Sequence, residues 1–119
     1  MDGKPPTLHD HLPLSPAVFH ILLALADGEK HGYAIMKEVE FFSEGQARMG
    51  PGTLYGTLKR LLEARLVRES GERPDPALDD QRRRYYAISP LGGQVLDAEV
   101  ERLSRLVQVA RRKPALGGV

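Results

Sequence analysis

The chain has 119 residues, of which 41% are hydrophobic and 28% are charged, and its formal net charge is +1. This composition is typical of a single globular domain and argues against wholesale disorder. There is no cysteine, which excludes disulfides and thiolate chemistry. No apolar run reaches the roughly 20 residues of a membrane helix, and the N-terminus lacks a signal-peptide core. We therefore expect a soluble, cytoplasmic protein without a membrane partner.

The charge is unevenly distributed along the chain. Residues 1–47 carry 3 basic and 7 acidic side chains, a net of −4, whereas residues 48–88 carry 9 and 6, a net of +3. Residues 89–119 carry 5 and 3, a net of +2. A basic segment favours a polyanionic partner such as DNA. Random scatter over a solvated surface is the alternative.

The chain begins with a segment that lacks periodicity. Residues 1–13 contain three prolines, which predicts a flexible N-terminal arm. The first helix starts at Ser15-Pro16, because serine is a good N-cap and proline suits the first helical position. It ends at Asp27-Gly28, where glycine suits a left-handed stop.

Two more helices are predicted, over about residues 31–42 and 52–64. In the later helix four leucines recur at i, i+4, i+7 and i+8, which predicts one buried face. These leucines are Leu54, Leu58, Leu61 and Leu62.

The second half of the chain predicts a hairpin followed by a helix. Residues 66–69 and 83–88 are typical of short strands, and residues 70–81 between them, rich in proline and acids, predict a long exposed loop. A second Ser-Pro pair begins a last helix over residues 90–112, and residues 113–119 are predicted to be a disordered tail.

This order of elements predicts a mainly α (α+β) fold, the winged helix-turn-helix, with three N-terminal helices, a two-stranded wing and a C-terminal dimerisation helix. Two strands alone do not form a stable sheet, so they must pack against the helices. The DNA-binding domain is predicted to span residues 14–89.

The exposed face of the helix over residues 52–64 suits DNA recognition. Small and hydroxyl-bearing residues near its start can approach base edges, and cations further along can reach phosphates. A glycine inside a helix destabilises it by roughly 1 kcal/mol relative to alanine. The close approach of another molecule would explain glycines on this exposed face, whereas contact with solvent alone would not. An ordinary amphipathic helix is the alternative. The face comprises Gly52, Thr53, Gly56, Lys59, Arg60 and Glu63, with Tyr55 and Thr57 on its flanks.

Three consecutive arginines, Arg82, Arg83 and Arg84, stand where the predicted loop enters the second strand, at the base or the tip of the wing, where they can contact phosphates. Strand alternation places Tyr86 and Ile88 on the core-facing side. The alternative is that the arginines neutralise the aspartates of the preceding loop.

Apolar residues in the last helix are spaced 4, 3, 4 and 3, which is a heptad seam and predicts a homodimer. The seam consists of Leu96, Val100, Leu103, Val107 and Ala110. The alternative is that this stripe packs onto its own domain.

No arrangement of residues indicates catalysis. His9-Asp10-His11 has no third ligand at a useful spacing, and no nucleophile, carboxylate pair or phosphate-binding loop is evident. We therefore predict no enzyme activity, no metal and no cofactor.

The sequence resembles the PadR-type transcriptional regulators. The likeness rests on LSPAVFHILLALADGEKHGYAIMKEVE (14–40), GPGTLYGTLKRLLEARLV (50–67) and DPALDDQRRRYYAISPLG (75–92). It implies a dimeric repressor of the short subgroup with one C-terminal helix, in which His31-Gly32-Tyr33 begin the supporting helix near the DNA backbone. Thr53, Tyr55, Lys59 and Arg60 are implied as recognition-helix positions. The sequence departs from the family pattern at Arg65, where glycine often ends the helix, and at Gly56.

We predict a sequence-specific transcriptional regulator, a repressor that binds a palindromic operator in double-stranded DNA as a homodimer. A winged-helix interaction module that does not bind DNA is the alternative, and a small-molecule effector is left open. The predicted DNA-binding residues are His31, Tyr33, Thr53, Tyr55, Gly56, Thr57, Lys59, Arg60, Arg82, Arg83 and Arg84.

Overall fold

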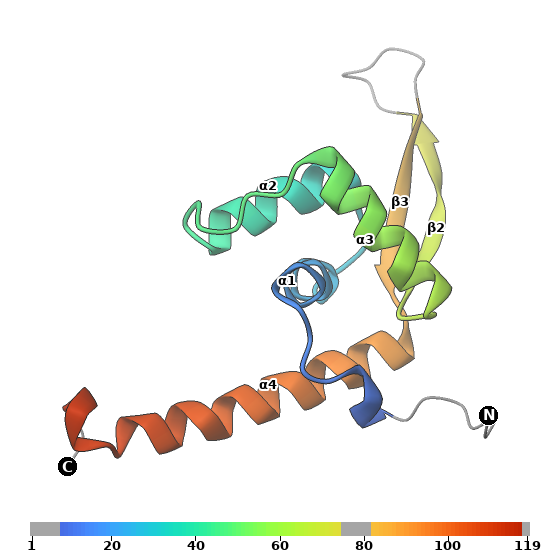
Figure 1. Ribbon diagram of the computed structural model, residues 1–119. Coiled ribbons are helices and arrows are strands. Elements are labelled where there is room, and N and C mark those ends of the chain that lie inside the picture. Colours follow the sequence, from blue (N-terminus) through green and yellow to red (C-terminus); the bar gives the residue numbers. More distant parts are fainter. Residues whose placement is uncertain (1–7, 75–81, 118–119) are drawn as a thin grey trace.

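The computed structural model describes residues 8–74 and 82–117. Three helices pack beside a small sheet, and a long terminal helix runs beneath them and projects to one side (Figure 1). The predicted winged helix-turn-helix arrangement is confirmed. The elements are η1 (Leu8–His11), α1 (Pro16–Leu25), β1 (Lys30–His31), α2 (Gly32–Phe42), α3 (Pro51–Glu63), β2 (Val67–Pro74), β3 (Arg82–Ile88), α4 (Pro90–Arg111) and η3 (Pro114–Leu116).

Both Ser-Pro pairs start helices as predicted. The hydroxyl of Ser15 accepts a hydrogen bond from the Val18 N–H at 3.3 Å. The hydroxyl of Ser89 accepts one from the Gly92 N–H at 2.9 Å and donates one to the Arg65 carbonyl at 2.7 Å. Each serine therefore satisfies a backbone N–H that the first helical turn leaves unpaired.

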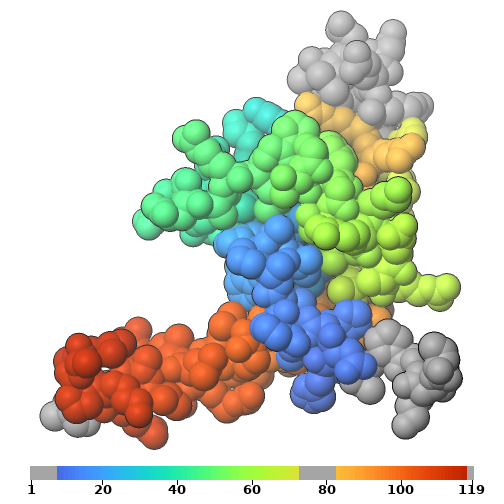
Figure 2. All heavy atoms as spheres, viewed as in Figure 1, coloured from blue at the N-terminus to red at the C-terminus, as the bar shows by residue number. Residues whose placement is uncertain are grey.

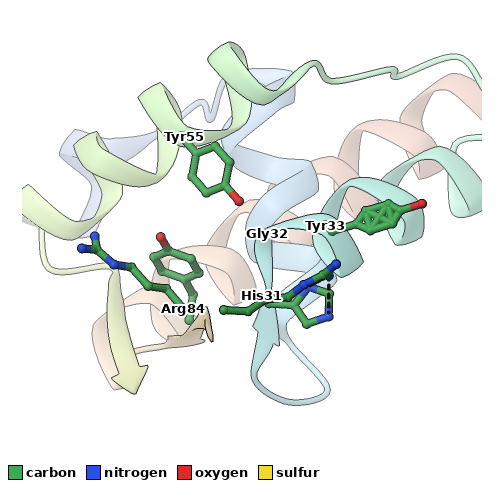
Figure 3. A pocket seen from close by; sticks show the side chains of 7 residues that line it. His31, Gly32, Tyr33, Tyr55 and Arg84 are labelled. Atoms are coloured by element: carbon green, nitrogen blue, oxygen red, sulfur yellow. Dashed lines mark hydrogen bonds between the residues drawn. The ribbon is translucent and has the colours of Figure 1, made fainter. Parts of the chain in front are cut away.

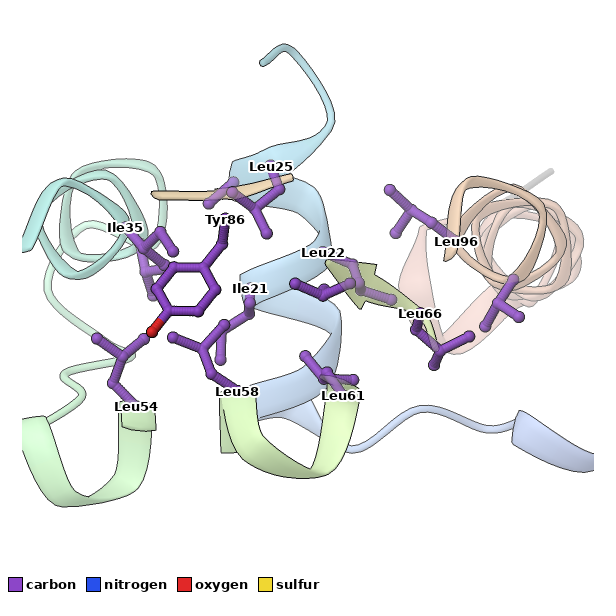
Figure 4. Close-up of a cluster of buried hydrophobic side chains, with 14 residues drawn as sticks. Ile21, Leu22, Leu25, Ile35, Leu54, Leu58, Leu61, Leu66, Tyr86 and Leu96 are labelled. Atoms are coloured by element: carbon purple, nitrogen blue, oxygen red, sulfur yellow. The ribbon is translucent and has the colours of Figure 1, made fainter. Parts of the chain in front are cut away.

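The hydrophobic core surrounds α1, the central helix of the domain (Figure 4). Three of the four predicted leucines of α3 are fully buried in it, and Leu62 is half-buried against it. Tyr86 and Ile88 of β3 pack on the same core, as strand alternation predicts. The remaining core residues come from α1, α2, α4 and the segment that leads into and starts β2, and they include Ile21, Leu22, Leu25, Ile35, Val39, Leu66, Val67, Val95 and Leu96.

The sheet has three antiparallel strands in the order β1-β3-β2, one more than predicted. The additional strand, β1, has only two residues and pairs with Tyr86 and Tyr85. Strand β2 continues to Pro74, so the prediction of a loop is wrong for residues 70–74. A bulge between Glu69 and Gly71 lets the strand continue. Residues 75–81 lie outside the described part.

The prediction of a flexible N-terminal arm is wrong for residues 8–11, because these residues form a helical turn that packs against α4. The backbone N–H of Leu14 donates to Glu99 Oε2 at 2.9 Å. Glu99 is only 2% exposed and accepts two further hydrogen bonds from Arg102, at 2.6 and 3.1 Å. This buried carboxylate fastens the arm to α4. Residues 1–7 are outside the described part.

Helix α4 has two different halves. Its first part packs on the domain, whereas its distal part projects away from the remainder of the chain (Figure 2). Leu96 is 7% exposed and belongs to the domain core, so its prediction as a dimer contact is wrong. In the predicted disordered tail, residues 114–116 form a short exposed 3-10 turn.

Within residues 8–74 and 82–117, no helix is both long and apolar enough to cross a membrane.

Candidate nucleic-acid interface

The polar face of α3 is exposed, as the helical wheel predicts. Its leucines point into the core, so Thr53, Gly56, Lys59 and Arg60 lie on the solvent side. No other group lies within 4 Å of a Cβ built on Gly56. The face is therefore open along its length and carries two cations near its C-terminal half.

Thr57 does not belong to this face. Its side chain is 1% exposed, and its hydroxyl accepts a hydrogen bond from Arg60 Nη2 at 3.3 Å. The prediction of Thr57 as a DNA-reading residue is wrong, because this position rotates towards the core beside Leu54 and Leu58. Its hydroxyl instead holds the Arg60 side chain along the helix.

A cavity of about 470 Å³ lies beside α3, where the starts of α2 and the wing strand β3 meet it (Figure 3). The Tyr55 hydroxyl points towards Gly32, and a Cβ at position 32 would clash with it. Gly32 is therefore required for Tyr55 to pack against the start of α2. The lining residues are His31, Gly32, Tyr33, Tyr55, Arg83, Arg84 and Tyr86. The cavity thus collects five of the predicted DNA-binding residues from three segments.

Tyr86 forms the floor of this cavity and joins it to the core. Burial raises the pKa of the Tyr86 phenol, and the neighbouring Glu69 carboxylate raises it further. The phenol therefore stays neutral at physiological pH and acts as a hydrogen-bonding group without charge.

The start of α2 is a second feature suited to an anion. His31 is the N-cap, and its Nδ1 accepts a hydrogen bond from the Ala34 N–H at 3.1 Å. The preceding N–H groups of the first turn have no partners within the helix, and the helix dipole places positive potential there. Phosphate oxygens bind readily at such helix starts.

The wing arginines occupy different environments. Arg83 lies against His31 and over the Tyr33 ring, with its Cζ 5.3 Å from the ring centroid. Arg84 is exposed and extends away from His31, with its Nε 3.8 Å from a Glu69 carboxylate oxygen. Arg82 begins β3, but its side chain lies outside the described part. The loop aspartates that could neutralise these arginines lie outside it too.

Two basic residues beside this surface escaped the sequence analysis. The Lys37 ammonium lies 5.2 Å from the centroid of the Tyr33 ring, and Lys37 and Arg48 both line a second cavity, on the other side of Tyr33 beside α2. Arg48 also pairs with Glu40 at 3.1 Å. The i, i+4 spacing of Tyr33 and Lys37 on a helix is the signal that could have identified the lysine.

A second surface, on α4, is apolar. Val100, Leu103, Leu106, Val107 and Ala110 follow one side of the helix at 3.6-residue periodicity, and all are exposed or half-buried. We call these five residues the α4 apolar face. It retains four residues of the predicted seam and adds Leu106.

Among the described residues, no group of three or more histidine, aspartate or glutamate side chains is arranged to hold a metal ion.

These features define a winged helix-turn-helix protein, in which α2 and α3 form the helix-turn-helix and β2 and β3 form the wing. Residues 21–98 match the sequence profile of the transcriptional regulator PadR-like family. The chain therefore belongs to the PadR-like family of transcriptional regulators, as its motifs predict. This is a family of regulators, in agreement with the prediction that the chain is not an enzyme.

Related proteins support this assignment. A transcriptional regulator of Mycobacterium tuberculosis is 37% identical over 89 residues, which cover 75% of this chain and 77% of that protein. An uncharacterized 37.1 kDa transposon protein of Streptomyces fradiae is 41% identical over 86 residues, or 72% of this chain, which spans only 22% of that protein's length. Bacillus subtilis PadR, crystallised in complex with operator DNA, has a similar fold, with a TM-score of 0.64 and 19% identity over 74% of this chain and 47% of that one.

Proposed function

We propose that this protein binds specific double-stranded DNA through α3 and regulates transcription. The observation that carries the proposal is the open polar face of α3, with Thr53 and Gly56 near its start and Lys59 and Arg60 further along. An α-helix fits the major groove, where small and hydroxyl-bearing side chains can approach base edges. The family assignment and the operator complex of Bacillus subtilis PadR support this proposal.

The cavity beside α3 is the proposed phosphate site. It combines the positive end of α2 with the guanidinium groups of Arg83 and Arg84 and the hydroxyl of Tyr55. Phosphate contacts fix the position of a protein on the duplex without reading its sequence. In this arrangement α3 supplies specificity and the cavity supplies register and affinity.

We further propose that two copies associate through the α4 apolar face. Exposed apolar side chains that follow one side of a projecting helix are suited to an identical helix across a two-fold axis. A symmetric dimer presents two α3 helices to the DNA, so its operator is a palindrome with half-sites about one helical turn apart. We propose that the dimer acts as a repressor in the cytoplasm, where its operator would lie.

The test is selection from a random-sequence duplex library, followed by titration of the enriched duplex at several salt concentrations. We expect an enriched palindrome and a linear fall of the logarithm of affinity with the logarithm of salt concentration. Lys59→Ala should weaken binding and lower the magnitude of the salt slope by about 0.9 for one lost phosphate contact. Arg105→Ala, which removes an exposed charge from the outer side of α4, is the matched control and should change neither quantity.

Failure to enrich any sequence, with only weak and uniform binding to all duplexes, would contradict the proposal. That outcome would favour a winged-helix module that binds another protein.

A further inference from the structure

We infer that His31 is a positioning residue that holds Arg83 in place for DNA phosphate. The inference rests on the proposed DNA binding. It gives His31 a role of its own, whereas the sequence analysis grouped this residue with the DNA-contacting side chains. It joins the wing to the helix-turn-helix through one side chain.

The backbone places His31 at the junction of these two units. It is the last residue of β1, where it pairs with Tyr85 of β3, and it is also the N-cap of α2. Its ring meets the Tyr85 ring edge to face, with the ring centroids 5.3 Å apart. Residue 31 is therefore fixed from both sides, by the sheet and by the helix.

Hydrogen bonding determines what the His31 ring can do. Its Nδ1 accepts from the Ala34 N–H at 3.1 Å, so in the neutral imidazole the proton is on Nε2. Arg83 Nη1 lies 2.9 Å from Nδ1 and 3.2 Å from Nε2. Because Arg83 can only donate, its contact with Nδ1 shares the single lone pair that also accepts from the Ala34 N–H, and its similar distance to both nitrogens places it against the imidazole ring. One side chain thus contacts both the start of α2 and the wing arginine.

The consequence concerns the geometry of Arg83. Its guanidinium is fixed at one end by His31 and lies over the Tyr33 ring, a contact that cation–π attraction favours. A side chain held in this way loses less conformational entropy when it binds a phosphate. His31 therefore contributes to DNA binding by positioning the Arg83 guanidinium.

The test is a double-mutant cycle on the selected duplex. Arg83→Ala should weaken binding about tenfold, which corresponds to the loss of one charge-assisted hydrogen bond to phosphate. It should also reduce the magnitude of the salt slope by about 0.9. His31→Asn keeps an N-cap acceptor but cannot reach Arg83 in the same way, so it should weaken binding several-fold with little change in thermal stability. The double variant should bind no more weakly than Arg83→Ala alone, because both changes remove the same contact.

A matched cycle uses Arg84, which extends away from His31. His31→Asn and Arg84→Ala should act independently, so that their factors multiply. His31→Ser, a second cap-competent variant, replaces His31→Asn if the asparagine variant is destabilised.

If the factors for His31 and Arg83 also multiply, His31 contacts DNA independently and the inference is wrong. An unchanged affinity in Arg83→Ala would overturn it as well. In both cases specific binding by the wild-type protein would still support the proposed function, so the two failures are distinguishable.

Discussion

Helices α3 and α4 are both amphipathic, but they leave opposite faces exposed. In α3 the apolar stripe is buried within the chain, and the exposed side is polar and basic. In α4 the first part is anchored in the domain, and the distal part exposes apolar side chains. An exposed polar face with glycine is suited to a polyanion, whereas an exposed apolar face is suited to an identical surface.

The difference arises from where each helix lies in the fold. Helix α3 is held between α1, α2 and the wing, so that its leucines have partners in the same chain. Helix α4 has 22 residues and is longer than the domain surface against which it packs. Its distal apolar residues therefore have no described element of the same chain to cover them. The following predictions test this contrast, from the largest expected effect to the smallest.

The largest effect is expected from a charge on the α4 apolar face. Val107 is 48% exposed, so Val107→Glu should leave the fold of a single chain intact. In a dimer the glutamate would be buried without a partner, and sedimentation should show a monomer. Because a monomer contacts one half-site, affinity for a palindromic duplex should fall by about 100-fold or more.

Val109→Glu is the matched control for this change. Val109 is 50% exposed and lies two positions further along, on nearly the opposite side of the helix. It should leave the mass of the dimer unchanged. A dimer of unchanged mass in Val107→Glu would rule out the α4 apolar face as the main contact.

A smaller effect, with opposite signs in two measurements, is expected from Gly56→Leu. Leucine is the better helix former, and a Cβ at this position has no neighbouring group within 4 Å, so the free energy of unfolding should rise by up to about 1 kcal/mol. The added side chain would meet the floor of the groove, and specific DNA affinity should fall at least about tenfold.

Gly93→Ala controls for helix propensity, because its Cβ also meets no neighbour but lies on α4, away from α3. It should stabilise the protein without changing DNA affinity. Unchanged DNA affinity in Gly56→Leu would show that this side of α3 does not face the DNA.

Glu99 lies between the anchored and projecting parts of α4. Hydrogen bonds from Arg102 lower its pKa in the folded protein below the ordinary value of 4.5, and this outweighs the opposing effect of burial. A carboxyl whose pKa is lower in the folded than in the unfolded state stabilises the fold at neutral pH. That contribution declines as the pH falls below about 4.5 and is lost below the folded-state pKa.

Glu99→Gln should therefore lower the free energy of unfolding by about 1–2 kcal/mol at pH 7. The unfolding curves of the variant and the wild type should converge in acid. Glu101→Gln, an exposed neighbour, is the control and should follow the wild type at each pH. A constant difference between Glu99→Gln and the wild type from pH 7 to pH 3 would contradict the role of the charge.

The smallest effect is expected at the end of α3. Arg65 has a φ of 64°, and the Leu66 N–H donates to the Leu61 carbonyl at 3.0 Å, as in a Schellman motif. Arg65→Gly relieves about 1–2 kcal/mol of left-handed strain but increases the entropy of the unfolded chain. We expect a net gain of about 0.5–1 kcal/mol in chemical denaturation with unchanged DNA affinity. A loss of stability would show that the arginine side chain contributes more than its backbone strain.

Local signals predicted the helices well. The Ser-Pro pairs predicted the capped starts of α1 and α4, and the leucine spacing predicted the buried face of α3. Thr57 was misplaced because its wheel position lies at the edge of the stripe, where the packing of neighbouring helices decides which way a side chain turns. The continuation of β2 over residues 70–74 was missed because the composition of this segment favours a loop. Pairing with β3 extends the strand past the bulge, and this pairing is a long-range contact.

By itself, the sequence determined the four long helices, the wing hairpin and the polar face of α3, because periodicity and caps are local properties. Its motifs also indicated the family by resemblance. Only the tertiary structure decided that Leu96 belongs to the domain core, that Glu99 is buried against the arm and that residues 30–31 form a strand. The Glu99–Leu14 and His31–Arg83 contacts join residues 85 and 52 positions apart. Such contacts leave no periodic signal, because they depend on how separately formed elements meet in space.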